Sequence, residues 1–235
     1  MIPGLVHGLV GGVPVVELEL VGVGASGNAN SVSYSHTPQA GDMAIFIDSA
    51  YSSSIDVEYA PSTPPAASSP SGFTDFVNDT NYFTWIGRDY AGRLIVFGRV
   101  CDGSEGSTVW GMTQGNRRKV LALFRPSVPV TFDADVTGSN LAKGNGSTSN
   151  TLPVSLSARS LAPVLNIVAY QYGQNTSIAI TGMPSLTSLD SGQTGHRTAF
   201  ACQQLPAELA TQDAALAQSR SNHIIGAILG LRLRP

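Results

Sequence analysis

The feature that most constrains the fold of this chain is a series of short apolar segments separated by turn residues, between positions 93 and 126. Arg93–Cys101 and Lys119–Phe124 are rich in Leu, Ile, Val and Phe, as β-strands commonly are. The intervening CDGSEGS and GNRR carry Gly, Asp, Asn and Ser, which favour turns. With Ser107–Gln114 as the middle strand, the stretch predicts an antiparallel meander. One face of that middle strand would carry Thr108, Trp110 and Met112.

Composition agrees with a turn-rich β protein. Charged residues make up 12% of the chain, about half the usual share, while 25 Gly and 14 Pro provide many turn positions. The net charge of −3 provides no basic face for nucleic acid, so we expect no nucleic-acid partner. We interpret the basic cluster at 117–119 as a solvated strand end.

Other segments extend the β pattern. Met43–Ile47, MAIFI, is continuously apolar and predicts a central, fully buried strand. Residues 22–27, GVGASG, superficially match a Gly-rich phosphate loop. The sequence that follows favours a strand rather than a helix, so we interpret these residues as a hairpin loop. Ala60–Pro70 is a Pro/Ser/Ala loop expected to be extended and exposed. Ser71–Val77 and Tyr82–Arg88 predict two short strands.

The chain also contains a degenerate internal repeat. Residues 32–47 align without a gap on residues 154–169, and both read as a polar strand, a turn and a buried strand. Each half closes on an apolar strand that ends in Arg-Pro. We therefore predict one sandwich domain at 17–235, with halves 17–127 and 128–235. Two separate small sandwiches are the alternative.

The repeat also bears on residues 207–220, whose composition suggests a helix. Their counterpart in the first half reads as turn, strand and turn. We therefore favour a strand near Ala214–Ser219, a turn at Arg220–Asn222 and a closing strand at His223–Leu233.

Residues 1–16 form an apolar arm punctuated by Gly and Pro, without a helical or strand period. An exposed apolar arm is a liability in a free monomer, so one interpretation is a segment that docks on a neighbouring subunit. The other is an arm folded back on its own sandwich. The segment lacks the roughly 20 apolar residues of a spanning helix, so we expect no membrane insertion. The candidate docking residues are Ile2, Leu5, Val6, Leu9, Val10 and Val13.

Residue patterns that carry catalytic chemistry are not found. No His has a second ligand at metal spacing, and Asp133 and Asp135 are interpreted as strand carboxylates rather than a calcium site. We expect no enzyme activity, no cofactor and no metal.

Cys101 and Cys202 end apolar runs and are expected to be buried thiols, with a bridge between them not derivable from sequence. Tyrosines in or beside loops suit recognition of sugar or protein, or simply strand ends. They are Tyr51, Tyr59, Tyr82, Tyr90, Tyr170 and Tyr172.

The order of four motifs resembles a class of bacteriophage virion proteins. A Gly-Asp-plus-apolar run at 41–47 is followed by a Pro-x-Gly-aromatic-Thr turn at 70–74. An apolar strand, a turn and strand, and an apolar strand ending in Arg near a Pro occupy 94–126, and residues 224–234 form the closing strand. The resemblance implies a jelly-roll-like sandwich on the tail, tail tip or fibre, or decorating the capsid. It carries over no catalytic residue.

The sequence therefore predicts an all-β protein: an antiparallel, jelly-roll-like β-sandwich built from two degenerate repeats, with an extended N-terminal arm. The leading hypothesis is a non-enzymatic structural or attachment protein of a phage particle, made in the host cytoplasm and located in the virion. Its expected partners are other virion proteins, copies of itself and a host surface glycan. Alternatives are a capsid decoration protein, a carbohydrate-binding module and, third, a glycan-cleaving enzyme.

Overall fold

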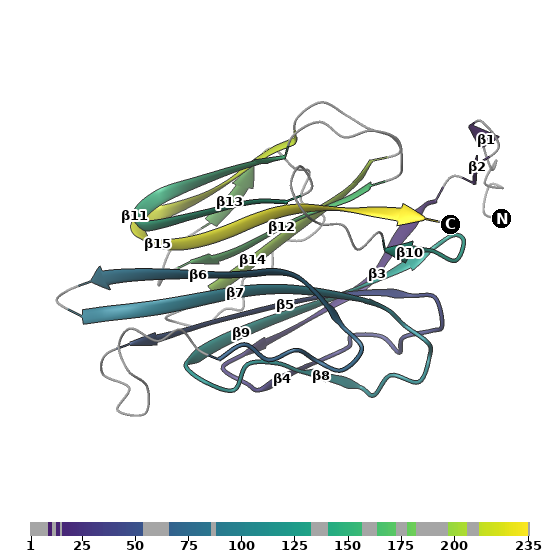
Figure 1. Ribbon diagram of the computed structural model, residues 1–235, viewed down its shortest axis with the longest axis horizontal. Helices are drawn as coiled ribbons and strands as arrows, with labels where there is room; N and C mark the ends of the chain where they lie inside the picture. The colour runs from purple at the N-terminus through teal and green to yellow at the C-terminus, as the bar shows by residue number, and fades with distance from the viewer. Residues whose placement is uncertain are drawn as a thin grey trace.

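The computed structural model describes residues 9–10, 13–14, 16–53, 66–85, 88–132, 141–156, 164–172, 178–181, 197–205 and 212–234. These residues form strands and turns, with no helix among them, and every strand pairing is antiparallel. The all-β prediction is confirmed for this part of the chain. Figure 1 shows its strands in two main layers.

The first layer is a five-stranded sheet in the order β3-β9-β5-β7-β6. The central place of β5 confirms the prediction for MAIFI, since Met43–Ile47 has no exposed side chain. The strands are β3 (Leu18–Gly27), β5 (Met43–Ser53), β6 (Thr74–Trp85), β7 (Arg88–Val100) and β9 (Asn116–Pro126).

The predicted meander at 93–126 is wrong in its pairing. β7 and β9 flank β5 on opposite sides and do not pair with each other. The short strand between them, β8 (Thr108–Trp110), pairs instead with β4 (Ser31–Ser33) in a small separate sheet. The physical reason is that β5 is apolar on both faces and takes the position where both faces are covered. The two short strands expected at 71–77 and 82–88 are likewise replaced by one strand, β6.

The second layer comes from the C-terminal half and is a six-stranded sheet around the long strand β15 (Gln212–Arg234). β15 confirms strand rather than helix for residues 212–220. The turn predicted at Arg220–Asn222 is wrong, because these residues continue β15, whose pairing with β11 shifts register between Ser149 and Thr151. The other strands are β10 (Thr131–Phe132), β11 (Leu141–Leu156), β12 (Val164–Tyr172), β13 (Ile178–Thr181) and β14 (Arg197–Leu205).

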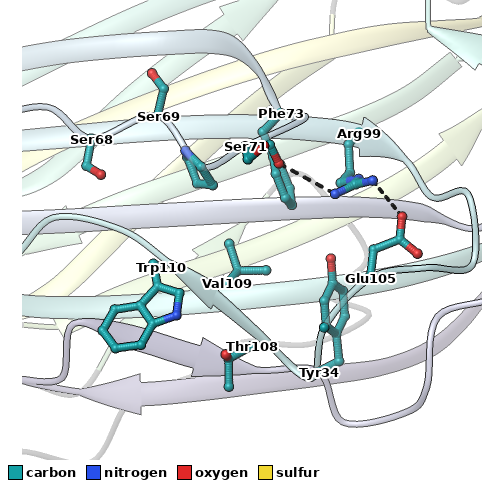
Figure 2. A pocket seen from close by; sticks show the side chains of 12 residues that line it. Tyr34, Ser68, Ser69, Ser71, Phe73, Arg99, Glu105, Thr108, Val109 and Trp110 are labelled. Carbon is teal, nitrogen blue, oxygen red and sulfur yellow. Dashed lines mark hydrogen bonds and ion pairs between the residues drawn. The ribbon is translucent and has the colours of Figure 1, made fainter.

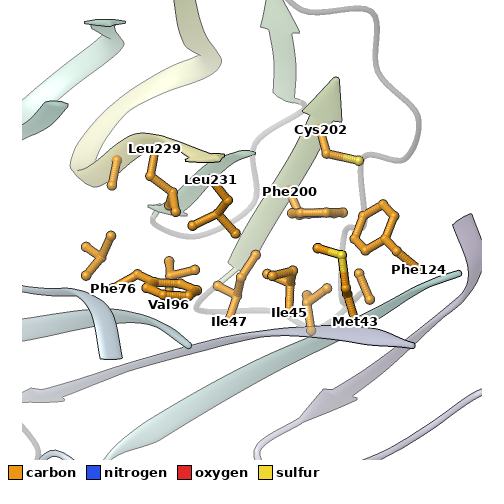
Figure 3. Packing of buried hydrophobic residues seen from close by; sticks show 14 of the residues in the cluster. Met43, Ile45, Ile47, Phe76, Val96, Phe124, Phe200, Cys202, Leu229 and Leu231 are labelled. Carbon is orange, nitrogen blue, oxygen red and sulfur yellow. The ribbon is translucent and has the colours of Figure 1, made fainter. Parts of the chain in front are cut away.

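The two layers share one buried apolar cluster (Figure 3). Alternate residues of β5 point into it from one side, and β14 and β15 contribute from the other. Each fully buried large side chain of this kind stabilises a fold by about 1.5–3 kcal/mol relative to exposure. Its members include Met43, Ile45, Ile47, Phe124, Phe200, Cys202, Leu229 and Leu231.

The opposite face of the five-stranded sheet is also buried, under β4 and β8 (Figure 1). Phe46 and Phe97 stack there with ring centroids 5.7 Å apart. Cys101 belongs to this outer cluster and Cys202 to the cluster between the layers. Both cysteines are buried free thiols, as predicted. Burial raises the pKa of each thiol to about 12.

Glycines in β3 allow the segment after β4 to approach closely. The hairpin loop predicted at 22–27 is wrong, because these residues are part of β3 and pair with β9. The turn follows at Asn28, which has a positive φ of 40°. A Cβ at Gly24 would overlap the Ser33 carbonyl, and one at Gly22 would overlap the Ser35 hydroxyl. The Gly pattern that resembles a phosphate loop therefore serves packing.

Replacing Gly24 by Ala should lower the free energy of unfolding by about 1–3 kcal/mol, because β4 must move away from β3. Gly106→Ala is the matched control, since a Cβ there meets no atom within 4 Å. Urea denaturation followed by circular dichroism measures both. Equal stability of the two variants would contradict the close approach.

Candidate functional site

A pocket of about 350 Å³ lies on the outer side of the five-stranded sheet, between β4–β8 and the segment that precedes β6 (Figure 2). This volume falls within the roughly 300–1,000 Å³ typical of small-ligand sites. One side is formed by residues 68–73 and the other by Tyr34, Thr108, Val109 and Trp110. Arg99 and Glu105 lie at one end and Trp110 at the other (Figure 2).

A tight turn forms one rim of the pocket. The Phe73 amide donates a hydrogen bond to the Pro70 carbonyl at 3.1 Å, and Gly72 has a φ of 77°. A positive φ at the third residue is the signature of a type II turn, which explains the glycine. The described end of the Ala60–Pro70 loop, residues 66–70, has no regular secondary structure and is largely exposed, as predicted.

The charged residues at the Arg99 end of the pocket are engaged with each other. Arg99 lies 2.6 Å from Glu105, whose side chain is 2% exposed and also accepts the amides of Asp102 and Gly103 at 2.8 and 2.9 Å. The Arg99 guanidinium stands 5.6 Å from the centre of the Phe73 ring, a cation–π contact. These contacts hold the turn at 70–73 against the 101–106 loop and neutralise both charges.

Trp110 is a large apolar side chain that is 62% exposed. It shares the outward face of β8 with Thr108, while Val109 points into the outer core. Met112 was expected on the same face, but β8 ends at Trp110 and Met112 is buried.

The Tyr34 hydroxyl is buried at the pocket and has no hydrogen bond of ordinary geometry within the described part of the chain. Burial raises the pKa of this phenol, and the neighbouring Cys101 thiol and Glu105 carboxylate add to the effect. Tyr34 therefore stays neutral and keeps a hydrogen-bonding group directed at the pocket (Figure 2).

A buried ion pair fixes the connection that follows β8. Asp48 and Lys119 are cross-strand partners on β5 and β9, both fully buried, with Lys119 Nζ 3.0 Å from Asp48 Oδ1. The Met112 amide donates to Asp48, and Lys119 donates to the Met112 carbonyl at 3.0 Å. Burial raises the pKa of Asp48 and lowers that of Lys119, and their opposite charges counter both shifts. The pair thus anchors the chain just beyond Trp110.

This arrangement corrects the interpretation of residues 117–119 as a solvated strand end. Arg118 is 4% exposed and Lys119 is fully buried, because β9 continues through them beside β5. Sequence reasoning also missed Asp48, which directly follows the MAIFI run. The available signal was an Asp at the end of one apolar strand and a Lys at the start of another.

A second ion pair joins two of the motifs that carried the family resemblance. Arg125, from the Arg-Pro end of β9, contacts Asp42 of the Gly-Asp turn through Nε and Nη2, each at 2.9 Å. Burial acts to raise the pKa of Asp42. Hydrogen bonds from Arg125 and from the Gln39 amide outweigh burial and hold this pKa below its ordinary value. This pair is a structural contact that closes the end of β5.

The candidate docking residues of the arm are not part of the pocket. Leu9–Val10 and Val13–Pro14 form two short strands, β1 and β2, that pair with each other and with neither large sheet. The described part of the arm is thus a hairpin rather than extended. Ile2, Leu5 and Val6 lie outside the described residues, and docking stays a prediction.

The tyrosines selected from the sequence do not line the pocket, whose tyrosine is Tyr34. Tyr59 lies outside the described residues, as do Asp133 and Asp135. Within the described ranges, no group of three or more His, Cys, Asp or Glu side chains is placed to hold a metal ion. The same ranges contain no helix long and apolar enough to cross a membrane.

Comparison with known proteins yields no relative. No family model, curated protein or solved structure matches this chain.

Replacing Lys119 by Met should lower the free energy of unfolding by about 3–5 kcal/mol, because Asp48 would remain buried without its cation. Asp48→Asn should also destabilise, and the double variant should lose less than the sum of the two single losses. Urea denaturation of the three variants measures the coupling. Additive losses would contradict the pair.

Stability should also depend on pH through Asp42. A carboxyl whose pKa is depressed in the folded state stabilises the fold above its unfolded pKa, about 3.9, and loses this contribution as the pH falls through the folded pKa. Asp42→Asn should cost about 1–3 kcal/mol at pH 7 and much less at pH 3. Urea denaturation at both values checks this. The exposed Glu17→Gln is the control, and a loss at Asp42 that is independent of pH would contradict the assignment.

Proposed function

We propose that this chain is a non-enzymatic structural component of a phage particle, associated with the tail, tail tip or fibre. It would dock on copies of itself and on other virion proteins, and it would present the outer side of its five-stranded sheet. The observation that carries the proposal concerns the ion pairs of the described part. Their charged side chains bond to each other and hold loops in place. Asp48 pairs with Lys119, Asp42 with Arg125 and Glu105 with Arg99.

The chemistry of the pocket supports binding rather than turnover. The Glu105 carboxylate pairs with Arg99 and accepts two amide hydrogen bonds, so its oxygens hold the 101–106 loop in place. Burial, followed by the nearby Glu105 carboxylate, raises the pKa of the Cys101 thiol to about 12, which keeps it protonated and a poor nucleophile at neutral pH. A rigid rim with an exposed Trp suits the presentation of a surface.

We also propose that the fold is a sandwich of two sheets that arose by duplication. The strand order β9-β5-β7 in the first sheet corresponds to β15-β12-β14 in the second. Ile45 and Ile167, which the sequence repeat aligns, lie opposite Ala122 and Leu229, and both partners are in the shared core. Each half supplies one sheet, which favours this plainer arrangement over a jelly roll. Capsid decoration is the alternative location.

The test is recovery of the chain in intact particles purified from cultures of the organism that encodes it. We expect the full chain to co-purify, and a chain lacking residues 1–14 to be lost from particles. This deletion keeps Val16, which is 1% exposed in the shared core, so the sheets should still form.

Circular dichroism confirms folding of the shortened chain, and light scattering compares the masses of the two forms. Absence of the full chain from particles would overturn the proposed function. Equal incorporation with and without the arm would overturn docking alone.

A further inference from the structure

We propose that the pocket between Trp110 and the Arg99–Glu105 pair binds a neutral saccharide. One face of a sugar ring would lie on the Trp110 indole, and the ring hydroxyls would bond to groups along the pocket. This site would give the proposed surface-presenting role a class of ligand. Its biological setting rests on the proposed function.

The position of Trp110 is the first argument. An indole that is 62% exposed leaves a flat apolar face in water. The ring face is electron-rich, so it attracts the slightly positive C–H hydrogens on the apolar face of a pyranose. The backbone that carries Trp110 is held in place, because β8 pairs with β4 and the next turn is clamped by Asp48 and Lys119. A Trp side chain has only two χ angles, so it loses little conformational entropy on binding.

The polar groups along the pocket are the second argument. Ser68, Ser69 and Thr108 bring hydroxyls to its edges (Figure 2). The Tyr34 hydroxyl is buried without a hydrogen bond of ordinary geometry in the described part of the chain. Its protein neighbour is the Cys101 thiol, a weak hydrogen-bond partner. Because buried polar atoms are nearly always satisfied, a ligand hydroxyl would be a stronger partner for this group. A sugar hydroxyl both donates and accepts, and it therefore suits a lining of hydroxyl groups.

Charge selects a neutral ligand. Arg99 and Glu105 are 2.6 Å apart and cancel each other, so the pocket carries no net charge. An anionic ligand would meet the Glu105 carboxylate and compete for a guanidinium that is already paired. An extended peptide would have to run past the Arg99–Glu105 pair, which occupies one end of the pocket (Figure 2). A compact uncharged ligand remains.

The experiment screens the purified full chain on an array of neutral glycans, followed by titration calorimetry with the methyl glycoside of each terminal sugar that binds. N-acetylneuraminic acid is the charged probe and a proline-rich peptide the extended probe. The chain has two Trp residues, so a Trp85→Phe variant is used in which protection of tryptophan fluorescence from acrylamide reports contact with the exposed Trp110. We expect a neutral sugar to bind and to protect this fluorescence.

Variants then locate the site. Trp110→Ala should weaken binding roughly 10-fold or more, because the stacking face is lost. Tyr34→Phe should weaken binding roughly 2- to 10-fold by removing one hydroxyl. Thr113→Ala, an exposed change outside the pocket lining, should leave affinity unchanged. Circular dichroism verifies that each variant is folded.

Three results would overturn the saccharide site: no neutral glycan binds, only the charged probe or the peptide binds, or Trp110→Ala binds as tightly as the parent chain. These outcomes are separable from failure of the proposed function. A chain found in particles that binds no sugar refutes the site alone. A chain that binds sugar but is absent from particles refutes the virion role alone.

Discussion

The burial of β5 on both faces is the constraint on which the rest of the structure depends. Met43, Ile45 and Ile47 point into the cluster shared with the second sheet, while Ala44 and Phe46 point into the cluster under β4 and β8. A strand so enclosed has no water for its backbone groups, so ladders must satisfy them on both sides. β7 and β9 provide these ladders, and the other strands follow from that placement.

Asp48 is a charged residue buried within β5, where it pairs with Lys119. A buried ion pair adds little net stability, because desolvation offsets the attraction between the charges. Asp48 and Lys119 also bond to the two backbone groups of Met112, which fixes where the connection after β8 lies. A Cβ at the adjacent Gly111 would overlap Asp48, so the backbone there approaches closely. We infer that the pair specifies one arrangement of the outer face.

The sequence allowed local structure to be predicted better than pairing or site. Continuous apolarity identified β5, and the inferred repeat favoured strand over helix at 212–220, which the structure confirms. Pairing was missed, because Arg93–Pro126 reads as a meander until β5, far back in the chain, is placed between β7 and β9. The Gly-rich stretch at 22–27 was compared with a phosphate loop and interpreted as a hairpin loop. The close approach of Ser33 to Gly24, which explains the glycine, arises only in the folded chain. Trp110 and Tyr34 had no signal, because exposure and an unsatisfied hydroxyl arise from packing.

The layering also constrains where a binding surface can lie. The inner face of the first sheet is covered by the second sheet, and most of its outer face is covered by β4 and β8. A ligand that binds the outer face of this sheet must therefore reach the edge of this outer cover, where the turn at 70–73 and the 101–106 loop leave a pocket. Phe73 contacts Phe46 there, edge to face, with centroids 6.1 Å apart. The pocket rim is thus continuous with the buried core, which makes it a rigid place for recognition.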